Sequence, residues 1–590
     1  MFQNTQKLSI SGLKWIIKES NKETCYKLGR ETDMSTILKT IISKRDLSSL
    51  TIKDYLKPTL KKLTPNPLDL DEMEQAVNIF YDAILNNNKL GILGDYDVDG
   101  ATSSALIYNY LSEIEFNNVE VFIPDREKDG YGLSKNAVNF FIKKSINLAV
   151  CLDCGTNDTK IVNYAKSNNI KIIVIDHHEQ KQINLPHALV NPKKNKDNSE
   201  LDYLATAGLV FLFLIALNRK LKKNNFFSKK KKAPDLRQYL DLVALGTVCD
   251  LVPLVKANRL FVKKGIIEIN KKKNKGIKTL LEKLNINEVV SETDLGFYLG
   301  PCINAPGRIG ESTLGFKVLS ISSDQYYSNF ADALLNNNHE RKTLENIAYK
   351  QAKKKISAFK YKNDIKVSKK FILVSDRNWH SGIIGIIASR LTNEYGVPSI
   401  VISSKNNNTK GSIRSIRGVS ASEIINFLNE KNVILNGGGH NMAAGFTLKN
   451  SCIETIENLL KIYFSSIIIK KQKILKIDIP LDLFKVNAEL IEKIKEIGPF
   501  GQENEEPRVA LKNLKVAFKK EVGKSQEHIF CILKDYFGKT INAIAFNQSS
   551  TKLGKILFSE KEFNVAGKLR VYKKENQLTP QLIIEDILIL

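Results

Sequence analysis

Carboxylates and imidazoles follow short apolar runs at four places in the chain. In residues 171–178, an apolar run precedes an Asp-His-His triplet. The other three runs lie in residues 90–100, 149–155 and 241–250, and one or more aspartates follow each of them. Carboxylate and imidazole ligands without a thiolate cluster suit hard or borderline divalent metal ions. The candidate ligands are Asp95, Asp97, Asp99, Asp153, Asp176, His177, His178 and Asp250.

The four apolar runs predict the elements that position these side chains. Residues 172–175 are Ile-Ile-Val-Ile, and such a run is typical of a buried strand. In an open parallel sheet, ligands bind beyond the carboxyl ends of the strands. We therefore expect four strand ends to converge on one site. A site this rich in carboxylates can hold two ions about 3.5–4 Å apart, an arrangement that hydrolyses phosphoesters. A single aspartate after a strand, by contrast, more often opens a turn.

Several motifs together resemble those of the DHH phosphoesterase superfamily. They are Gly-Asp-Tyr-Asp-Val-Asp-Gly at 94–100, Asp-Cys-Gly at 153–155, Asp-His-His at 176–178 and Gly-Thr-Val-Cys-Asp at 246–250. Within this superfamily, the chain most resembles the RecJ-type exonucleases, which act 5′→3′ on single-stranded DNA. The motifs that carry this closer resemblance are residues 123–126, 130–133 and 437–445. This resemblance extends from about residue 60 to the C-terminus.

The resemblance implies a role for each candidate residue. It implies that two divalent ions, Mn²⁺ or Mg²⁺, are bound by Asp97, Asp99, Asp153, His177 and Asp250, with Asp95 as a further ligand. His178 is then placed by the scissile phosphate, and Asp176 orients a histidine. The implied substrate-binding residues are Arg126, Tyr131, Asn304, Arg308, His380, Ser412, Arg414 and His440. Cys302 stands where the family usually has an arginine, which puts a DNA contact at that position in doubt.

The predicted fold class is α/β. We expect a DHH-type parallel-sheet domain and a smaller DHH-associated α/β domain joined by a long helix, with a C-terminal OB-type β-barrel. The expected divisions are an N-terminal extension (1–60) packed on the next domain, the catalytic domain (61–265), a helical connector (266–365), the associated domain (366–465) and the barrel (466–590). The long helix is expected over residues 331–355.

Five strand-like runs near the C-terminus predict the barrel. They cover residues 508–519, 528–535, 541–546, 563–572 and 578–590. Five strands of this length are consistent with an OB-type barrel that binds single-stranded nucleic acid. A purely structural barrel has the same pattern.

Composition favours a polyanionic partner. The 590 residues carry a formal net charge of +26, which favours nucleic acid first and an anionic membrane second. A lysine-rich proteome is the alternative explanation.

Residues 219–232 form a basic surface insertion that could add phosphate contacts or remain merely solvated. Residues 205–217 are apolar but too few to span a bilayer, so a buried helix and a cytoplasmic protein without membrane contact are expected.

The expected function is single-strand-specific 5′→3′ DNA exonuclease activity that releases 5′-mononucleotides in recombination and repair. The expected partners are single-stranded DNA, a single-strand-binding protein and a helicase, and the chain is expected to be a monomer. Three alternatives stay open: another DHH phosphoesterase acting on oligoribonucleotides or cyclic dinucleotides, a manganese pyrophosphatase, and a non-catalytic scaffold that binds DNA.

Overall fold

The computed structural model describes residues 7–31, 33–45, 47, 50–181, 183, 185–320, 324–361, 370–404, 408–467, 474–523, 525–559, 561–574 and 577–589. The chain divides into two compact units. One unit comprises Met1–Pro65, Leu251–Lys263 and Lys471–Leu590, and the other comprises Asn66–Asp250 and Lys264–Lys470. The division differs from the expected one, because residues 251–263 belong with the barrel and not with the catalytic domain.

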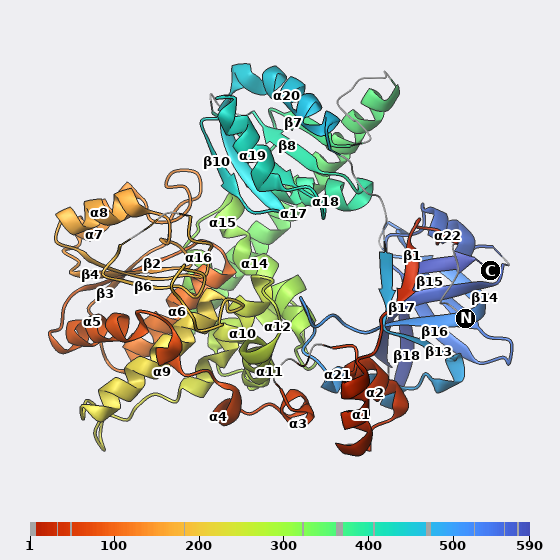
Figure 1. Ribbon diagram of the computed structural model, residues 1–590, viewed down its shortest axis with the longest axis horizontal. Helices are drawn as coiled ribbons and strands as arrows, with labels where there is room; N and C mark the ends of the chain where they lie inside the picture. Colours follow the sequence, from red (N-terminus) through yellow and green to blue (C-terminus); the bar gives the residue numbers. More distant parts are fainter. Residues whose placement is uncertain are drawn as a thin grey trace. The chain divides into compact units, whose positions relative to one another are not determined.

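A five-stranded parallel sheet forms the first domain of the larger unit. Its strand order is β3 (Val119–Phe122), β2 (Leu90–Gly94), β4 (Leu148–Leu152), β5 (Lys171–Ile175) and β6 (Ala188–Val190). Helices cover both faces, as expected for parallel strands that read as continuous apolar runs. The helices α7 (Lys135–Lys143) and α8 (Thr159–Ser167) cover one face (Figure 1). The helices α5 (Met73–Leu85), α6 (Val98–Glu113) and α9 (Thr206–Lys223) contact the strands from the other.

The fourth apolar run is a helix, so the prediction of a strand there was wrong. Residues Leu240–Cys249 form α10, which packs against α6 and α9. Every residue from Leu240 to Thr247 is buried. A helix that is apolar on all sides is typical of a buried position. The run is ten residues long, and this length favours a helix over a short strand.

Helix α9 is buried along most of its length, as the sequence predicted for residues 205–217. Its last turn includes Arg219–Lys223, so the first part of the basic insertion is helical and not a loop. No helix in the described part of the chain is long and apolar enough to cross a membrane.

Short helices connect the two domains of the larger unit. They are α12 (Lys275–Lys283), α13 (Glu292–Asp294), α14 (Gly300–Asn304), α15 (Pro306–Ile309) and α16 (Leu314–Leu319). The glycines and prolines of residues 300–310 break this stretch into short helical pieces, as their helix propensities predict. The long helix α17 follows at Asp324–Tyr361 and is longer at both ends than the predicted 331–355.

The second domain of the larger unit is built on a mixed sheet. Its strand order is β10 (Asn436–Gly439), β11 (Ala443–Lys449), β9 (Asn408–Arg414), β8 (Ser399–Ser403) and β7 (Ile372–Asp376). Strands β7 and β8 are parallel, and the other neighbours are antiparallel. Helices α19 (Ala421–Glu430) and α20 (Ile453–Ser465) share one apolar core with the sheet, and α17 and α18 (Ile384–Tyr395) share another.

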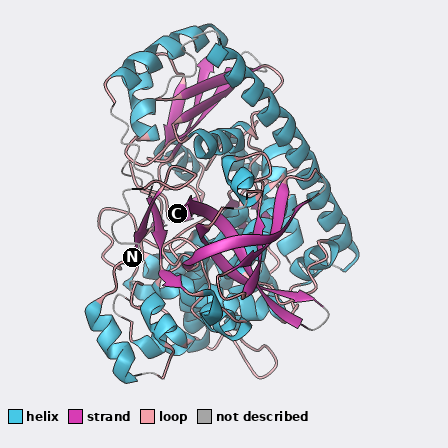
Figure 2. Ribbon diagram, turned by 90° about the vertical axis from the view of Figure 1, so that its right-hand side faces the viewer, coloured by secondary structure: helices cyan, strands magenta, loops and turns pink. Residues whose placement is uncertain are grey.

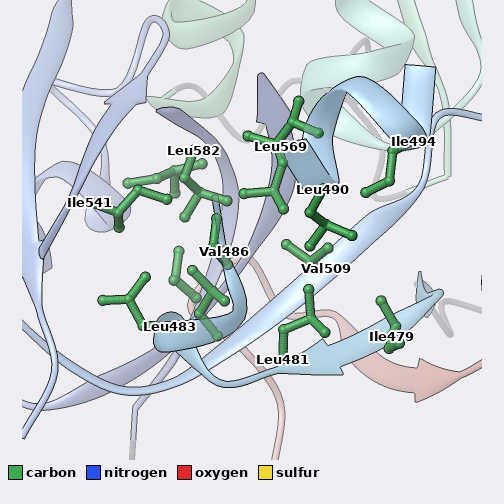
Figure 3. Packing of buried hydrophobic residues seen from close by; sticks show 14 of the residues in the cluster. Ile479, Leu481, Leu483, Val486, Leu490, Ile494, Val509, Ile541, Leu569 and Leu582 are labelled. Atoms are coloured by element: carbon green, nitrogen blue, oxygen red, sulfur yellow. The ribbon is translucent and has the colours of Figure 1, made fainter. Parts of the chain in front are cut away.

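The C-terminal strands form a closed barrel, which confirms the predicted OB-type architecture. Around the barrel the order is β14 (Arg508–Val522), β15 (His528–Lys534), β16 (Thr540–Ala545), β18 (Gln577–Ile589) and β17 (Phe563–Lys574), and pairing of β17 with β14 closes it. Figure 2 draws all strands of the chain, those of the barrel included, in magenta. The short strand β13 (Ile479–Leu481) extends β14, and the helices α21 (Ala488–Glu496) and α22 (Lys552–Leu557) accompany the barrel. Figure 3 shows Leu490 and Ile494 of α21 in the same apolar cluster as Val509 and Leu569 of the barrel strands.

The N-terminal extension shares the core of this barrel, so the prediction that it packs on the next domain was wrong. Its elements are β1 (Lys14–Ile17), α1 (Lys22–Glu31), α2 (Thr36–Ile42), α3 (Ile52–Leu56) and α4 (Leu60–Leu63). Leu38 and Ile41 belong to the apolar cluster of the barrel. Strand β1 pairs in parallel with β12 (Ile474–Ile477), and the Trp15 indole donates a hydrogen bond to buried Asp586 at 2.8 Å.

The segment Leu251–Lys263 is anchored to the same unit. The Arg259 guanidinium is buried and donates hydrogen bonds to the carbonyls of Tyr55, Ile497 and Gly498. It also stacks over the Tyr55 ring, with 3.9 Å from its central carbon to the ring centroid. A buried arginine is tolerated where its N–H groups have acceptors, and both terminal nitrogens of Arg259 have them here. This segment includes the first residues of α11 (Lys256–Asn270), and the rest of that helix belongs to the larger unit.

Candidate active site

Carboxylates and one imidazole gather where the parallel strands end. Asp95 follows β2, Asp97 is the N-cap of α6, Asp153 follows β4 and His177 follows β5. Asp250 is the C-cap of α10. The ligand atoms within each of three groups lie within 4.8 Å of one another. These groups are Asp153, His177 and His178; Asp99, His177 and Asp250; and Asp95, Asp97 and Asp153.

His177 lies at the centre of this cluster. Its Nε2 is 3.5 Å from Oδ1 of Asp153 and 3.3 Å from Oδ2 of Asp250. Both ring nitrogens are buried without a hydrogen-bond partner among the described residues, as are Oδ1 of Asp95 and Oδ2 of Asp250. Buried polar atoms are normally satisfied, and each unsatisfied one needs an explanation. Unpaired imidazole nitrogen and carboxylate oxygens, packed this closely, fit divalent metal ions.

Burial and mutual repulsion perturb the carboxylates of the cluster. Burial raises the pKa of Asp99 to about 7 and that of Asp250 to about 9, and the neighbouring carboxylates add to both shifts. The pKa values of Asp95 and Asp153 lie well above the usual range for the same two reasons. Burial lowers the pKa of His177 to about 3, so its ring is neutral and able to act as a ligand. A site that disfavours its own negative charge is suited to cations.

The N-terminus of α9 holds two of these carboxylates. The backbone N–H groups of Thr206 and Ala207 donate to the two oxygens of Asp99 at 2.7 and 2.9 Å. The Thr206 hydroxyl donates to Oδ1 of Asp153 at 3.0 Å. Free N–H groups and the helix dipole make a helix N-terminus a good partner for a carboxylate. Sequence reasoning missed Thr206, although its place at the start of the predicted buried helix was a usable signal.

Asp176 organises the loop after β5 through hydrogen bonds, and these bonds occupy its carboxylate so that it is not a candidate metal ligand. Its carboxylate accepts from the backbone N–H groups of Thr156, His177 and His178 and from Nδ1 of His178, which is 2.7 Å away. Burial disfavours its charge, but the hydrogen bond and charge of His178 outweigh burial, so the pKa of Asp176 lies well below its usual range. Burial also opposes the His178 cation, yet Asp176 raises the pKa of His178 to about 9. Asp176 therefore holds one ring orientation and keeps His178 protonated.

Tyr131 and His440 also contact His178. The Tyr131 hydroxyl lies 3.2 Å from the His178 ring nitrogens and donates to the Asp153 carbonyl at 3.0 Å. The His440 ring is stacked on the His178 ring, with centroids 6.4 Å apart. Asp153 itself has a φ of 62°, in a region that non-glycine residues seldom adopt. Such conformations cluster at functional sites.

A cavity of about 850 Å³ adjoins the cluster and is lined by both domains of the larger unit. Its lining includes the predicted residues Arg126, Tyr131, Asp176, His178, Arg308, Ser412, Arg414 and His440. Two predicted substrate-binding residues, Asn304 and His380, are not among the residues that line it. The His380 Nδ1 instead accepts from the N–H of Gly382 at 3.1 Å, within its own turn. Lining residues that the sequence reasoning missed include Lys181, Lys410, Ser381 and Asn157.

Three arginines make one wall of this cavity cationic. The guanidinium of Arg414 donates to the hydroxyl of Ser412 at 3.1 Å, and that of Arg126 lies 5.4 Å from the centroid of the Tyr96 ring. Burial lowers the pKa of Arg308 to about 10, and nearby Arg126 and Arg414 contribute to the shift. A methyl group on Gly385 would lie 3.0 Å from Nη2 of Arg414 and 3.2 Å from Ser412 Oγ. The glycine therefore leaves room for a ligand beside these two side chains, and repelling guanidinium groups favour an anionic one.

Cys302 does not take over the position of the missing arginine. Its side chain is buried, and the amide of Asn338 on α17 donates to its sulfur at 3.2 Å. Arg341 is committed to Asn338 and to Glu345, at 2.9 and 2.8 Å. The thiol therefore faces α17 within the fold and does not line the cavity.

The barrel presents a separate aromatic surface. Along β15, Ile529, Cys531 and Leu533 point into the barrel core, so the alternate residues point outward. Phe530 on this outer face lies 6.5 Å from Phe518 of β14, between ring centroids, and the Lys520 ammonium lies over it at 5.6 Å. Outward-facing rings beside lysines suit stacking on the bases of a single strand. We call Phe518, Phe530 and Phe546 the outer aromatic face. The His528 ring packs on Phe546, with 5.2 Å between the ring centroids.

The first domain is a parallel sheet whose strand ends carry a cluster suited to metal ions. A second α/β domain lines the cavity beside this cluster. This combination defines the class of two-domain DHH proteins. The chain matches three family models: the DHH family N-terminal domain over residues 89–247, the DHHA1 domain over 364–467 and the RecJ OB domain over 477–586.

Curated relatives and solved structures are similar over most of the chain. The single-stranded-DNA-specific exonuclease RecJ of Haemophilus influenzae is 31% identical, covering 90% of this chain and 93% of its own length. The Escherichia coli protein of the same name is 30% identical, covering 88% and 90%. The crystal structure of RecJ from Thermus thermophilus in complex with Mn²⁺ has a TM-score of 0.77 at 23% identity, covering 97% of this chain and 79% of that one. An exonuclease RecJ bound to manganese has a TM-score of 0.57 at 26% identity, covering 68% and 96%. The chain belongs to the RecJ family of single-stranded-DNA-specific exonucleases.

Proposed function

We propose that this chain is a metal-dependent exonuclease that degrades single-stranded DNA from its 5′ end and releases 5′-mononucleotides. The observation that carries the proposal is the buried His177, whose two nitrogens lack partners among the described residues while three aspartates crowd around it. The adjoining cavity with its arginine wall provides room for a phosphodiester beside this cluster. The relatives named above supply the substrate class.

Two divalent ions, Mn²⁺ or Mg²⁺, would be held by Asp95, Asp97, Asp99, Asp153, His177 and Asp250. When bound, such ions activate water and neutralise the charge of the phosphoryl group. Two RecJ structures, with Mn²⁺ and with Mg²⁺, share this fold. The imidazole of His177 favours Mn²⁺ over Mg²⁺, because Mg²⁺ prefers oxygen ligands.

His178 is proposed to act on the substrate and not on the ions. Its ring is protonated at neutral pH because Asp176 stabilises the cation. Nδ1 is engaged by Asp176, so Nε2, which lies 3.2 Å from the Tyr131 hydroxyl, is the nitrogen left to donate a proton to the leaving oxygen or a hydrogen bond to developing charge. Tyr131 and His440 both contact this ring and help to hold it in place.

Recognition of the 5′ end is assigned to Arg126, Ser412 and Arg414. A terminal phosphate carries more negative charge than an internal diester, so a cationic fork distinguishes an end from the middle of a strand. The hydroxyl of Ser412 and the guanidinium of Arg414 are already hydrogen-bonded to each other and so present donors together. This arrangement would set the polarity of digestion.

The OB-type barrel is proposed to bind the rest of the single strand through its outer aromatic face. Recombination and repair are the processes in which such an enzyme would act, as a monomer in the cytoplasm, with a single-strand-binding protein and a helicase as partners. The cationic composition of the chain supports a nucleic-acid partner.

The direct test is digestion of single strands labelled at either end, with Mn²⁺ and with a chelator. We expect early release of the 5′ label as mononucleotide, no release in chelator, and little cleavage of a blunt duplex. An Asp153→Asn variant prepared in parallel should be inactive, which excludes a contaminating nuclease. Release of the 3′ label first would overturn the polarity, and cleavage in chelator would overturn the metal mechanism.

A further inference from the structure

A cationic patch lies at the end of α9 that is farthest from the catalytic cluster. Residues 219–232 contain eight lysines and arginines and no acidic residue. The exposed cations, which we call the α9 basic patch, are Arg219, Lys222, Lys223, Lys229, Lys230 and Lys232. None of them forms a salt bridge with another described residue. Like charges at this density repel one another, and an anionic partner would relieve the repulsion.

The patch has a defined shape and is not a loose tail. The N–H of Ser228 donates to the Lys231 carbonyl at 2.8 Å, and the N–H of Lys231 donates to the Ser228 hydroxyl at 3.1 Å. The Lys231 ammonium lies 4.4 Å from the centroid of the Phe226 ring, and Phe226 packs on Phe227. This turn presents Lys229 and Lys230 side by side next to the last turn of α9.

The patch is distinct from the active site. Helix α9 begins at Thr206, which contacts Asp99 and Asp153, and it ends at Lys223. The helix rises 1.5 Å per residue, so about 26 Å of helix separate these ends. No residue of the patch lines the substrate cavity. A ligand on the patch is therefore either a distant part of the strand under digestion or a second molecule.

We infer that the α9 basic patch is a second binding site for a nucleic-acid backbone. This inference rests on the proposed function, because it takes DNA as the ligand class. Flexible lysines that are free of salt bridges suit nonspecific phosphate contacts, which contribute affinity without reading sequence. The patch shows no exposed apolar side chain for membrane insertion, because Phe226 and Phe227 are half-buried and Phe226 is covered by Lys231.

The test replaces three patch lysines in the full-length chain: Lys223→Gln, Lys229→Gln and Lys230→Gln. The matched control removes three exposed charges from α7, α8 and the start of β5 in the same domain: Lys143→Gln, Lys160→Gln and Lys171→Gln. Both variants lower the net charge equally, and Lys143 ends α7 as Lys223 ends α9. Binding to a single strand of about 30 nucleotides is measured in chelator as a function of salt, since the slope counts phosphate contacts.

We expect the patch variant to bind about tenfold more weakly at low salt, with a slope shallower by about 2, because each phosphate contact on a single strand contributes about 0.7. The control should match the wild type. A slope in the patch variant equal to that of the control would overturn the inference. Dependence of phosphatidylserine-vesicle binding on the patch, with DNA binding unchanged, would overturn it in favour of a membrane surface.

Two further experiments show whether the patch binds the strand under digestion or a second nucleic-acid molecule. They also separate this inference from the proposed function. A trinucleotide cannot reach from the active site to the patch, so its cleavage rate should be the same in all three proteins. If the patch holds the strand under digestion, the variant loses kcat/KM on the long strand only. If the patch holds a second molecule, kcat/KM is unchanged, and a labelled duplex binds the wild type and not the variant. Failure of the wild type to cleave any single strand would contradict the proposed function, whereas normal cleavage with no effect of the patch would contradict the patch alone.

Discussion

Nδ1 of His178 lies 2.7 Å from the Asp176 carboxylate, whereas the ring nitrogens of the adjacent His177 have no hydrogen-bond partner among the described residues. Two neighbouring histidines thus occupy opposite environments. Burial keeps His177 neutral, while Asp176 keeps His178 charged. The difference follows from the strand end, where successive side chains point in different directions.

This difference predicts different consequences for the two alanine variants. His177→Ala should lose Mn²⁺ binding and activity together, because it removes a central ligand. His178→Ala should retain Mn²⁺ and lose about 10²–10⁴-fold in kcat, the usual contribution of a general acid. Isothermal titration with Mn²⁺ and turnover on a single strand check both, and circular dichroism verifies the fold. Normal metal content and turnover in His177→Ala would show that this histidine is not a ligand.

Arg414→Ala should abolish most of the preference for 5′-phosphorylated over 5′-hydroxyl strands. One charge-assisted contact contributes about 1.5–3 kcal/mol, which is roughly ten- to a hundredfold in affinity. Cleavage rates of the two strands at subsaturating concentration give the ratio in wild type and variant. Arg417→Ala, at an exposed arginine three residues further on that does not line the cavity, serves as the control for loss of one positive charge. An unchanged ratio in Arg414→Ala would remove the residue from end recognition.

Removing rings from the outer aromatic face of the barrel should weaken binding of long strands. A Phe530→Ala and Phe546→Ala double variant should lose about 1–3 kcal/mol for each base that stacks, while cleavage of a trinucleotide stays normal. Tyr26→Ala, which removes an exposed ring from α1, is the control. Fluorescence anisotropy with a labelled strand measures the affinity. Equal affinities of double variant and control would assign the barrel a structural role only.

Stability should depend on pH through Asp241, a buried carboxyl in the first turn of α10. Burial raises the pKa of Asp241 from 3.8 to about 7. The folded state therefore binds the proton more tightly than the unfolded state, and stability falls as the pH rises from about 4 to about 7. The loss is at most about 4 kcal/mol, at 1.36 kcal/mol per pKa unit.

Asp241→Asn should abolish this loss and raise the melting temperature at pH 8 but not at pH 4. Thermal melts at the two pH values measure the effect, and Asp82→Asn on the exposed face of α5 is the control. A variant no more stable than wild type at pH 8 would mean that Asp241 is ionised in the folded protein at little cost.

Local sequence determined which chemistry the site can perform. Apolar runs that end in aspartate and histidine specify strands that deliver ligands to one sheet edge, because the carboxyl ends of parallel strands lie together. The alternation of apolar and polar residues in the C-terminal region likewise determined the five barrel strands. Both patterns involve residues that are close together in the sequence, so they can be recognised without knowledge of the tertiary structure.

Tertiary structure decided how that chemistry is arranged. Asp250 reaches the cluster from a helix and not from a strand, since an apolar run of ten residues is compatible with either until its neighbours are known. Thr206 holds Asp99 and Asp153 across more than fifty residues of sequence, and β1 pairs with β12 across more than four hundred. Such long-range contacts are set by the packing of whole elements, because no local pattern of residues encodes which distant partner an N–H or a strand edge will meet.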